Sequence, residues 1–215
     1  MERKRVAILI SGRGSNMAAL IEAARRPDYP AEIVLVVASR GQAKGLARAR
    51  EAGIPTKVLE HAAFPDRAHF DRALDELLTA ERIALVCLAG YMRLLTPWFV
   101  ARWADRLLNV HPALLPSFRG LDTHARALAA GVKIHGATVH FVVPEVDAGP
   151  IIAQAAVPVL EGDTAETLAA RVLAVEHKIY PLALDLVARG CVRIVEGRCI
   201  IMGGAPSGPA LIVPA

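Results

Sequence analysis

Short continuous runs of apolar residues alternate along this chain with segments of helical periodicity. The runs are rich in Val, Ile and Leu, a composition typical of strands buried on both faces of a parallel sheet. The segments between them repeat apolar side chains every three or four residues, as helices with one buried face do. Strands are expected at 6–10, 33–38, 56–59 and 83–88, and helices at 17–24, 42–52, 65–80 and 98–104.

The C-terminal half departs from this alternation. Two apolar runs, 133–143 and 151–160, are joined by a short polar connection and predict an antiparallel hairpin. A long helix is expected from about Asp163 to Arg189, because apolar residues recur there at steps of three and four. We therefore predict an α/β fold with an open, mostly parallel twisted sheet, helices on both faces and an antiparallel hairpin near the C-terminal half.

With 215 residues, the chain is long enough to bury a substantial core. We expect one domain over residues 1–190, with an N-terminal half of about 1–100 and a second half of about 101–190. Beyond it, Gly and Pro separate short apolar runs, so 191–215 is expected to form terminal strands and a tail.

Composition excludes several classes of protein. Hydrophobic residues make up 54% and charged residues 21% of the chain, and no apolar run reaches the roughly 20 residues needed to span a bilayer. The net charge of +4 comes from basic residues dispersed among acids, and aromatic residues are scarce, so no nucleic-acid or membrane partner is expected. Cys87, Cys191 and Cys199 form no close pair, which indicates a reducing cytoplasm and no structural zinc.

A glycine-containing loop, Gly12 to Asn16, follows the first expected strand and precedes a helix. This order presents free backbone N–H groups to a phosphate at a helix N-terminus. Met17 stands where the dinucleotide-binding motif has its third glycine, so a monophosphate is the expected ligand. A tight turn that serves packing alone is the alternative.

A second group of polar residues lies where the run 106–111 breaks into a loop punctuated by Pro and Gly. In extended backbone, Asn109 and His111 project to the same side, and Pro112 biases His111 towards β or polyproline geometry. An amide and an imidazole side by side suit an oxyanion site. A capped strand end, in which both side chains satisfy local backbone groups, is the alternative.

Further candidates each have an ordinary structural interpretation. Asp147 lies in the hairpin connection, where a solvated turn residue is equally expected. Met92, Leu94 and Leu95 follow a central strand, at the edge where ligands gather in such sheets, although by composition they are core residues. Glu176 lies beside the apolar stripe of the long helix, and from the residues alone we expect an exposed, salt-bridging side chain.

Taken together, the motifs resemble the formyltransferases that use 10-formyltetrahydrofolate. The glycine loop makes the chain most similar to the members that act on phosphoribosylglycinamide in purine synthesis. The resemblance spans residues 8–190 and implies a Rossmann-like formyltransferase fold. It is carried by Asn109-Val110-His111-Pro112-Ala113-Leu114-Leu115-Pro116, Gly120, Val139-His140-Phe141 and Asp147-Ala148-Gly149-Pro150.

This resemblance implies that a formyl group passes from 10-formyltetrahydrofolate, as co-substrate, to the amine of 5′-phosphoribosylglycinamide, without a metal. The enzyme is expected to be cytoplasmic and either a monomer or a homodimer. By motif position, the resemblance assigns the binding of phosphoribosylglycinamide to Gly14, Ser15, Asn16 and Glu176. It assigns the binding of the folate to Arg67, Met92, Arg93, Leu94, Leu95, Asn109, Val143 and Asp147. It assigns catalysis to Asn109, His111 and Asp147, and the organisation of ordered water to Thr138 and His140.

The implied chemistry needs neither a metal nor a covalent intermediate. Attack of the amine on the formyl carbon creates a tetrahedral oxyanion, which the Asn109 amide and a protonated His111 can stabilise. A nearby Asp147 carboxylate favours the protonated imidazole. It can also relay a proton, through water, from the attacking amine to the departing folate nitrogen.

Three positions, Arg13, Arg119 and Ala148, depart from the family's pattern, and Arg119-Gly120 is similar to methionyl-tRNA formyltransferase instead. This leaves two alternatives open, another amine acceptor and hydrolysis of formyltetrahydrofolate. From a different class, a non-catalytic nucleotide-binding module would keep the glycine loop but would not need the three catalytic residues together. A zinc hydrolase is disfavoured, because the histidines lack ligand spacing.

Overall fold

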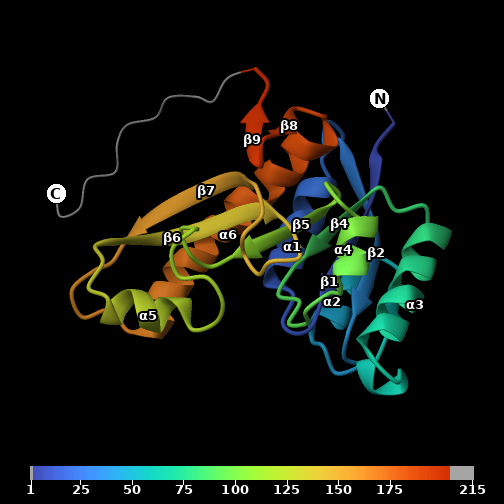
Figure 1. The fold of residues 1–215 in the computed structure, drawn as a ribbon, viewed down its shortest axis with the longest axis horizontal. Helices are drawn as coiled ribbons and strands as arrows, with labels where there is room; N and C mark the ends of the chain where they lie inside the picture. The colour runs from blue at the N-terminus through green and yellow to red at the C-terminus, as the bar shows by residue number, and fades with distance from the viewer. Residues whose placement is uncertain (1, 204–215) are drawn as a thin grey trace. The chain divides into compact units, whose positions relative to one another are not determined.

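The computed structural model describes residues 2–203, and their strands and helices alternate as the apolar pattern predicts (Figure 1). The chain divides into two compact units. The first unit holds the chain up to Asn109 together with Phe141–Pro144, and the second holds Val110–His140 and the chain from Glu145 onwards. Within residues 2–203, no helix combines the length and the apolar character that crossing a membrane requires.

The first unit is built on parallel strands. β1 pairs in parallel with β2 and β4, β2 with β3, and β4 with β5. The complete seven-stranded sheet has the order β3-β2-β1-β4-β5-β6-β7. Because neighbouring parallel strands run the same way, their carboxyl ends meet at one edge. The strands of this unit are β1 (Lys4–Ile10), β2 (Ala31–Ala38), β3 (Thr56–Val58), β4 (Leu85–Leu88) and the greater part of β5 (Leu107–His111).

Helices cover both faces of this part of the sheet, as predicted. On one face, Ala7 and Leu9 of β1 belong to a buried cluster that includes Leu74 and Trp103. On the other face, Ile10 packs directly against Gly45 at the start of the second helix. Consecutive side chains of a strand point to opposite faces, which explains why β1 is apolar throughout. The helices are α1 (Ser15–Ala24), α2 (Gly45–Glu51), α3 (Arg67–Ala80) and α4 (Pro97–Arg102), with a 3₁₀ turn η1 (His61–Ala63).

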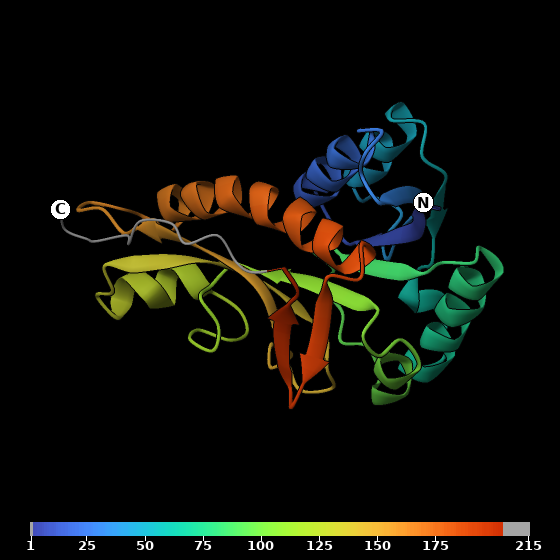
Figure 2. The same ribbon diagram turned by 90° about the horizontal axis from the view of Figure 1, so that it is seen from above.

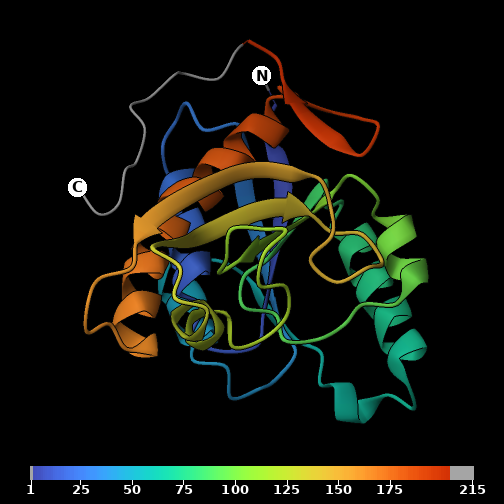
Figure 3. The ribbon, with the colours of Figure 1, turned by 60° about the vertical axis from the view of Figure 1, so that its left-hand side comes forward.

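The second unit contains the predicted antiparallel hairpin. Its strands β6 (Ile134–Phe141) and β7 (Ile151–Pro158) pair antiparallel and lie side by side in Figure 3. Helix α6 (Ala165–Ala188) runs along β7 (Figure 2). It starts with a reciprocal capping box between Thr164 and Thr167, which satisfies backbone groups that a helix end leaves open.

Shorter elements complete the second unit. Helix α5 (Thr123–Ala129) precedes β6, and β8 (Val192–Val195) pairs antiparallel with β9 (Arg198–Ile201). This pair lies within residues 191–215, the range for which terminal strands are expected from the Gly-punctuated apolar runs. The tail predicted after them lies, from residue 204 onwards, outside the described residues.

A buried histidine, His135 on β6, packs among aromatic rings. Its ring lies edge-on to Phe118 and His124, with centroid separations of 5.7 and 5.3 Å, and the residue is 1% exposed. Burial, and after it the charge of His124, lower the pKa of His135 from 6.5 to about 4, because burial disfavours the charged ring. Burial also lowers the pKa of His124.

We expect folding stability to fall as the pH drops from 6.5 towards 4. In that window the unfolded chain binds a proton at His135 that the folded chain does not. The contribution of the neutral, buried His135 to folding stability is therefore complete above the unfolded pKa of 6.5 and is lost progressively as the pH falls to about 4. His135→Asn should make the free energy of unfolding, measured by urea denaturation, depend less steeply on pH. The exposed His61→Asn is the control, and an unchanged slope in His135→Asn would contradict the assignment.

Candidate active site

In the first unit, Ser11 ties together loops that follow β1, β2 and β4. Its hydroxyl lies 2.8 Å from the hydroxyl of Ser39 and accepts the backbone N–H of Met92 at 2.9 Å. Its own backbone N–H donates to the carbonyl of Gly90 at 3.2 Å. The predicted phosphate loop and the 92–95 segment are therefore neighbours at the carboxyl edge of the strands. Sequence reasoning missed Ser11, because its partners come from distant parts of the chain.

The glycine loop has the predicted strand–loop–helix geometry. Gly14 has a φ of +70° and precedes Ser15, the first residue of α1. A Cβ on Gly14 would lie 2.9 Å from the Cα of Gly45, and the N–H of Gly45 donates to the carbonyl of Gly12 at 3.0 Å. Two backbones therefore touch directly, so both contact positions need glycine. Helix α2 starts at Gly45, later than the expected residue 42.

Met92 and Leu94 are not core residues, contrary to the expectation from composition. They are 69% and 61% exposed, whereas Leu95 is partly buried against the apolar cluster. The guanidinium of Arg93 lies over the ring of Phe70, 4.8 Å from its centroid. An ordered segment that exposes two large apolar side chains offers a surface that a flat aromatic ligand can cover.

The remaining first-unit candidates are placed individually. Arg67 is the first residue of α3 and is exposed, and Val143 is partly buried in the connection that follows β6. Asn109 is partly buried on β5, two positions before His111. The assignment of these three side chains to a ligand stays a prediction.

In the second unit, His111 and Asp147 form a buried pair. The Nδ1 of His111 lies 3.3 Å from Oδ2 of Asp147, and the two side chains are 6% and 11% exposed. His140 approaches the same carboxylate from β6, with Nε2 at 3.7 Å from Oδ1. Asp147 has a φ of +50°, a conformation that Asp tolerates better than most residues. The interpretation of Asp147 as a solvated turn residue is therefore wrong.

Backbone groups of residues 118–120 complete the surroundings of this pair. The carbonyl of Phe118 accepts a hydrogen bond from Nε2 of His111 at 3.0 Å. The N–H of Gly120 donates to Oδ2 of Asp147 at 2.9 Å. A carbonyl oxygen faces Nε2 and a carboxylate oxygen lies 3.3 Å from Nδ1, so both ring nitrogens face oxygen atoms that can accept a hydrogen bond. Sequence reasoning could not find these partners, because they are main-chain groups.

Thr138 holds the loop that follows β5. Its hydroxyl donates to the carbonyl of Ala113 at 2.7 Å and accepts from the N–H of Leu115 at 3.0 Å. It also accepts from the amide of Gln154 at 3.0 Å, and that amide donates to the carbonyl of Leu115. These contacts use the one donor and both lone pairs of the hydroxyl. The role of Thr138 towards ordered water stays a prediction, and its observed contacts fasten the loop.

Glu176 is buried, contrary to the expectation from the residues alone. It is 7% exposed on the inner face of α6. Val172 and Ala183, one turn before and two turns after it, are buried on the same helix, and residues spaced in this way share a face. The polar side chain thus interrupts an apolar stripe, and its assignment to a substrate stays a prediction.

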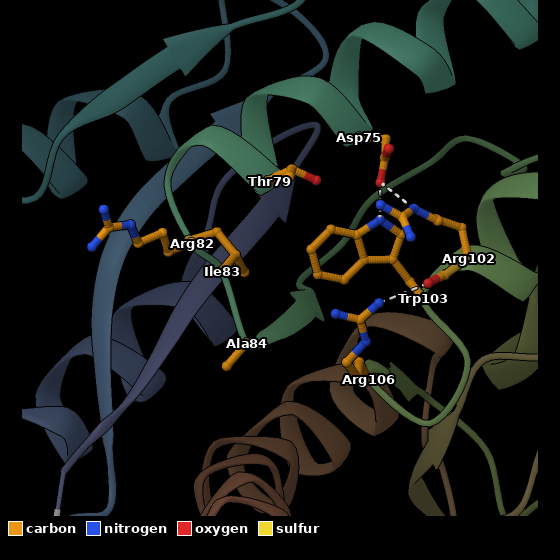
Figure 4. Close-up of a pocket in the computed structure, with 8 residues that line it drawn as sticks. All are labelled: Asp75, Thr79, Arg82, Ile83, Ala84, Arg102, Trp103 and Arg106. Carbon is orange, nitrogen blue, oxygen red and sulfur yellow. Dashed lines mark hydrogen bonds and ion pairs between the residues drawn. The ribbon is translucent and has the colours of Figure 1, made fainter.

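A cavity of about 410 Å³ lies at the opposite ends of the strands, in the first unit (Figure 4). It is lined by Ala84 before β4, Arg106 before β5 and the indole of Trp103. Asp75 accepts the indole N–H at 2.8 Å and lies 3.5 Å from Arg102. None of the predicted site residues lines this cavity.

The described part of the chain shows no group of side chains suited to bind a metal ion. Among residues 2–203, no cluster of three or more His, Cys, Asp or Glu side chains is arranged to hold a metal ion. The polar groups gathered around Asp147 are two imidazoles and a backbone N–H. This set suits proton transfer and the stabilisation of an oxyanion.

Known proteins share both the sequence and the fold. A phosphoribosylglycinamide formyltransferase from Haemophilus influenzae is 41% identical over 94% of this chain and 95% of its own length. The trifunctional purine biosynthetic protein adenosine-3 from Bos taurus is 52% identical over 91% of this chain. The chain spans only 19% of that longer relative.

A solved structure agrees over nearly the whole chain. The crystal structure of glycinamide ribonucleotide transformylase 1 from Symbiobacterium toebii matches with a TM-score of 0.91 and 48% identity. The match covers 93% of this chain and 94% of that one, which confirms the predicted fold class. Residues 4–184 match the formyl transferase family. The chain therefore belongs to the formyl transferase family.

Proposed function

We propose that this chain transfers the formyl group of 10-formyltetrahydrofolate to the amine of 5′-phosphoribosylglycinamide, a step of purine synthesis. The observation that carries the proposal is the buried His111–Asp147 pair, in which both imidazole nitrogens face oxygen acceptors. Support for this particular acceptor comes from relatives of the same length that are named for it. The formyltransferases of this family take 10-formyltetrahydrofolate as co-substrate.

The proposed chemistry is a direct transfer. The amine attacks the formyl carbon, and the developing oxyanion accepts hydrogen bonds from the Asn109 amide and the His111 imidazolium. Asp147 stabilises that imidazolium and relays a proton, through water, from the attacking nitrogen to the folate nitrogen that leaves. His140, 3.7 Å from the carboxylate, would help to hold such a water.

One consequence follows from the geometry of His111. Each of its ring nitrogens faces a protein oxygen, so in the proposed reaction one N–H must be shared with the formyl oxygen. The contact of Nδ1 with Asp147, at 3.3 Å, is longer than the 3.0 Å bond of Nε2 to Phe118. We infer that the Nδ1 proton is the one shared with the oxyanion, because the longer contact is the weaker.

Binding roles follow the glycine loop and the exposed 92–95 segment. Gly14, Ser15 and Asn16 would bind the phosphate with backbone N–H groups at the start of α1, and Glu176 would bind the amine. The assigned folate residues would combine apolar contact with polar anchors. They are Arg67, Met92, Arg93, Leu94, Leu95, Asn109, Val143 and Asp147.

The alternatives make different demands on the site. Hydrolysis of formyltetrahydrofolate needs water in place of the amine and has no use for the phosphate loop. A non-catalytic nucleotide-binding module would not need a buried His–Asp pair. Removing such a pair from water costs stability, so its presence favours a catalytic role. Another amine acceptor would share the chemistry and differ only in its recognition.

The function is tested by a spectrophotometric formyl-transfer assay with 10-formyltetrahydrofolate. Three mixtures are compared, containing phosphoribosylglycinamide, no acceptor, or an unrelated sugar amine. We expect turnover with phosphoribosylglycinamide alone. Folate release without an acceptor would identify a hydrolase, and release with the other amine would show that the proposed acceptor is wrong.

Loss of either catalytic partner should lower turnover. We expect Asn109→Ala and Asp147→Asn each to reduce kcat by about 10²- to 10³-fold, because each removes a group that stabilises the transition state. Circular dichroism melting should show that both variants fold. Glu161→Gln, at an exposed loop position, is the control and should retain full activity. Near-normal turnover in Asn109→Ala or Asp147→Asn would refute the role assigned to that residue.

Gly45 should govern binding of the phosphate although it lies outside the glycine loop. A Cβ at this position would lie 2.7 Å from Cδ1 of Ile10, 3.2 Å from the Cα of Gly14 and 3.3 Å from the Gly12 carbonyl oxygen. Because the two loop contacts are with backbone atoms, Gly45→Ala should displace the loop. We expect the KM for phosphoribosylglycinamide to rise about tenfold while kcat changes less, because a displaced loop weakens ground-state binding. Ala47→Ser, on the exposed side of α2, should leave both constants unchanged. An unaltered KM in Gly45→Ala would show that this contact does not shape the site.

A further inference from the structure

The segment 118–122 supports the His111–Asp147 pair through its backbone. Phe118 accepts from His111, and Gly120 donates to Asp147. Three of its residues, Phe118, Gly120 and Asp122, have positive φ values of 56°, 81° and 55°. For a bulky residue such as Phe this region is unfavourable, and it persists only where surrounding contacts impose it.

Arg126, on α5, supplies contacts that hold this segment. One guanidinium nitrogen, Nη1, donates to the carbonyl of Arg119 at 2.6 Å and to that of Leu121 at 3.3 Å. The guanidinium carbon lies 5.7 Å from the centroid of the Phe118 ring. A single side chain thus touches residues 118, 119 and 121, on either side of the Gly120 N–H that reaches Asp147.

We propose that Arg126 is a positioning residue for the formyl transfer. It holds the 118–122 segment so that the Phe118 carbonyl and the Gly120 N–H fix the orientation of His111 and Asp147. Arg126 itself is exposed, and its side chain contacts residues 118, 119 and 121, so it acts through the backbone of this segment. A guanidinium suits this task, because one of its nitrogens can donate to two carbonyls while the cation lies near an aromatic ring.

The contacts of Arg126 differ in kind from those of Arg119, which belongs to the 118–122 segment itself. The side chain of Arg119 forms an exposed ion pair with Glu145 at 3.1 Å, and exposed pairs of this kind contribute little. The contacts of Arg126 are instead to main-chain carbonyls of the segment. We therefore expect the segment to depend on Arg126 more than on Arg119.

The inference rests on the proposed function for its kinetic test. Arg126→Ala should lower kcat about 10- to 100-fold, as small displacements of reacting groups do, while the KM of each substrate stays within about twofold. The pH at which kcat is half-maximal should also move. Arg126→Lys should recover part of the activity, because an ammonium can bond a carbonyl but lacks the planar guanidinium group that lies near the Phe118 ring. Arg193→Ala, which removes the same charge from β8, is the matched control.

A double-mutant cycle separates positioning from general damage. If Arg126 acts through the catalytic pair, Arg126→Ala should have little further effect on kcat in the Asp147→Asn background. An equal fall in both backgrounds, or a kcat of Arg126→Ala within twofold of wild type, overturns the proposal. If Arg126→Ala does not fold by circular dichroism, Arg126→Lys decides the matter by the same cycle.

One readout needs no substrate and no activity. The ¹⁵N and ¹H resonances of the His111 ring report its hydrogen bonds directly, and they should shift in Arg126→Ala but not in Arg193→Ala. If formyl transfer is absent from the wild type yet these resonances shift, the proposed function fails and the positioning role stands. Unshifted resonances in Arg126→Ala refute the positioning role whatever the reaction is.

Discussion

A carboxylate that is removed from water needs hydrogen-bond donors or positive charge beside it. In the second unit this requirement determines which groups surround Asp147. Its side chain is 11% exposed, and the rings of His111 and His140 and the N–H of Gly120 all approach it. An unpaired buried charge would cost several kcal/mol. Because the donors come from β5, from the segment after it and from β6, meeting the carboxylate also brings these three segments together.

The first unit depends on a steric constraint of a different kind. The loop after β1 and the start of α2 touch through Gly14 and Gly45, with no room for a side chain at the contact. Ser11 then joins this loop to Ser39 and Met92 through its hydroxyl. The parallel sheet supplies the common edge, and these few close contacts decide where the loops on that edge lie.

Polar side chains inside the second unit mostly support the backbone of the loop after β5. Thr138 and Gln154 satisfy the main-chain groups of Ala113 and Leu115, which would otherwise be unpaired in a buried place. Arg126 bonds the exposed carbonyls of Arg119 and Leu121 further along the chain. A rigid main chain is useful here, because main-chain groups of Phe118 and Gly120 are the ones that reach the His111–Asp147 pair.

The sequence by itself determined most strands and helices, the parallel arrangement of the strands and the hairpin. It also singled out Asn109, His111 and Asp147 as candidate catalytic residues. The spacing of apolar residues and the residue preferences of turns are local properties, and each loop motif of this family consists of residues that are neighbours in the sequence. Only the tertiary structure decided that Glu176 is buried, that Met92 and Leu94 are exposed and that Gly45 supports the glycine loop. Burial depends on which elements pack together, and the carbonyl of Phe118 or the N–H of Gly120 looks the same at every position of a sequence until the fold directs it at a partner.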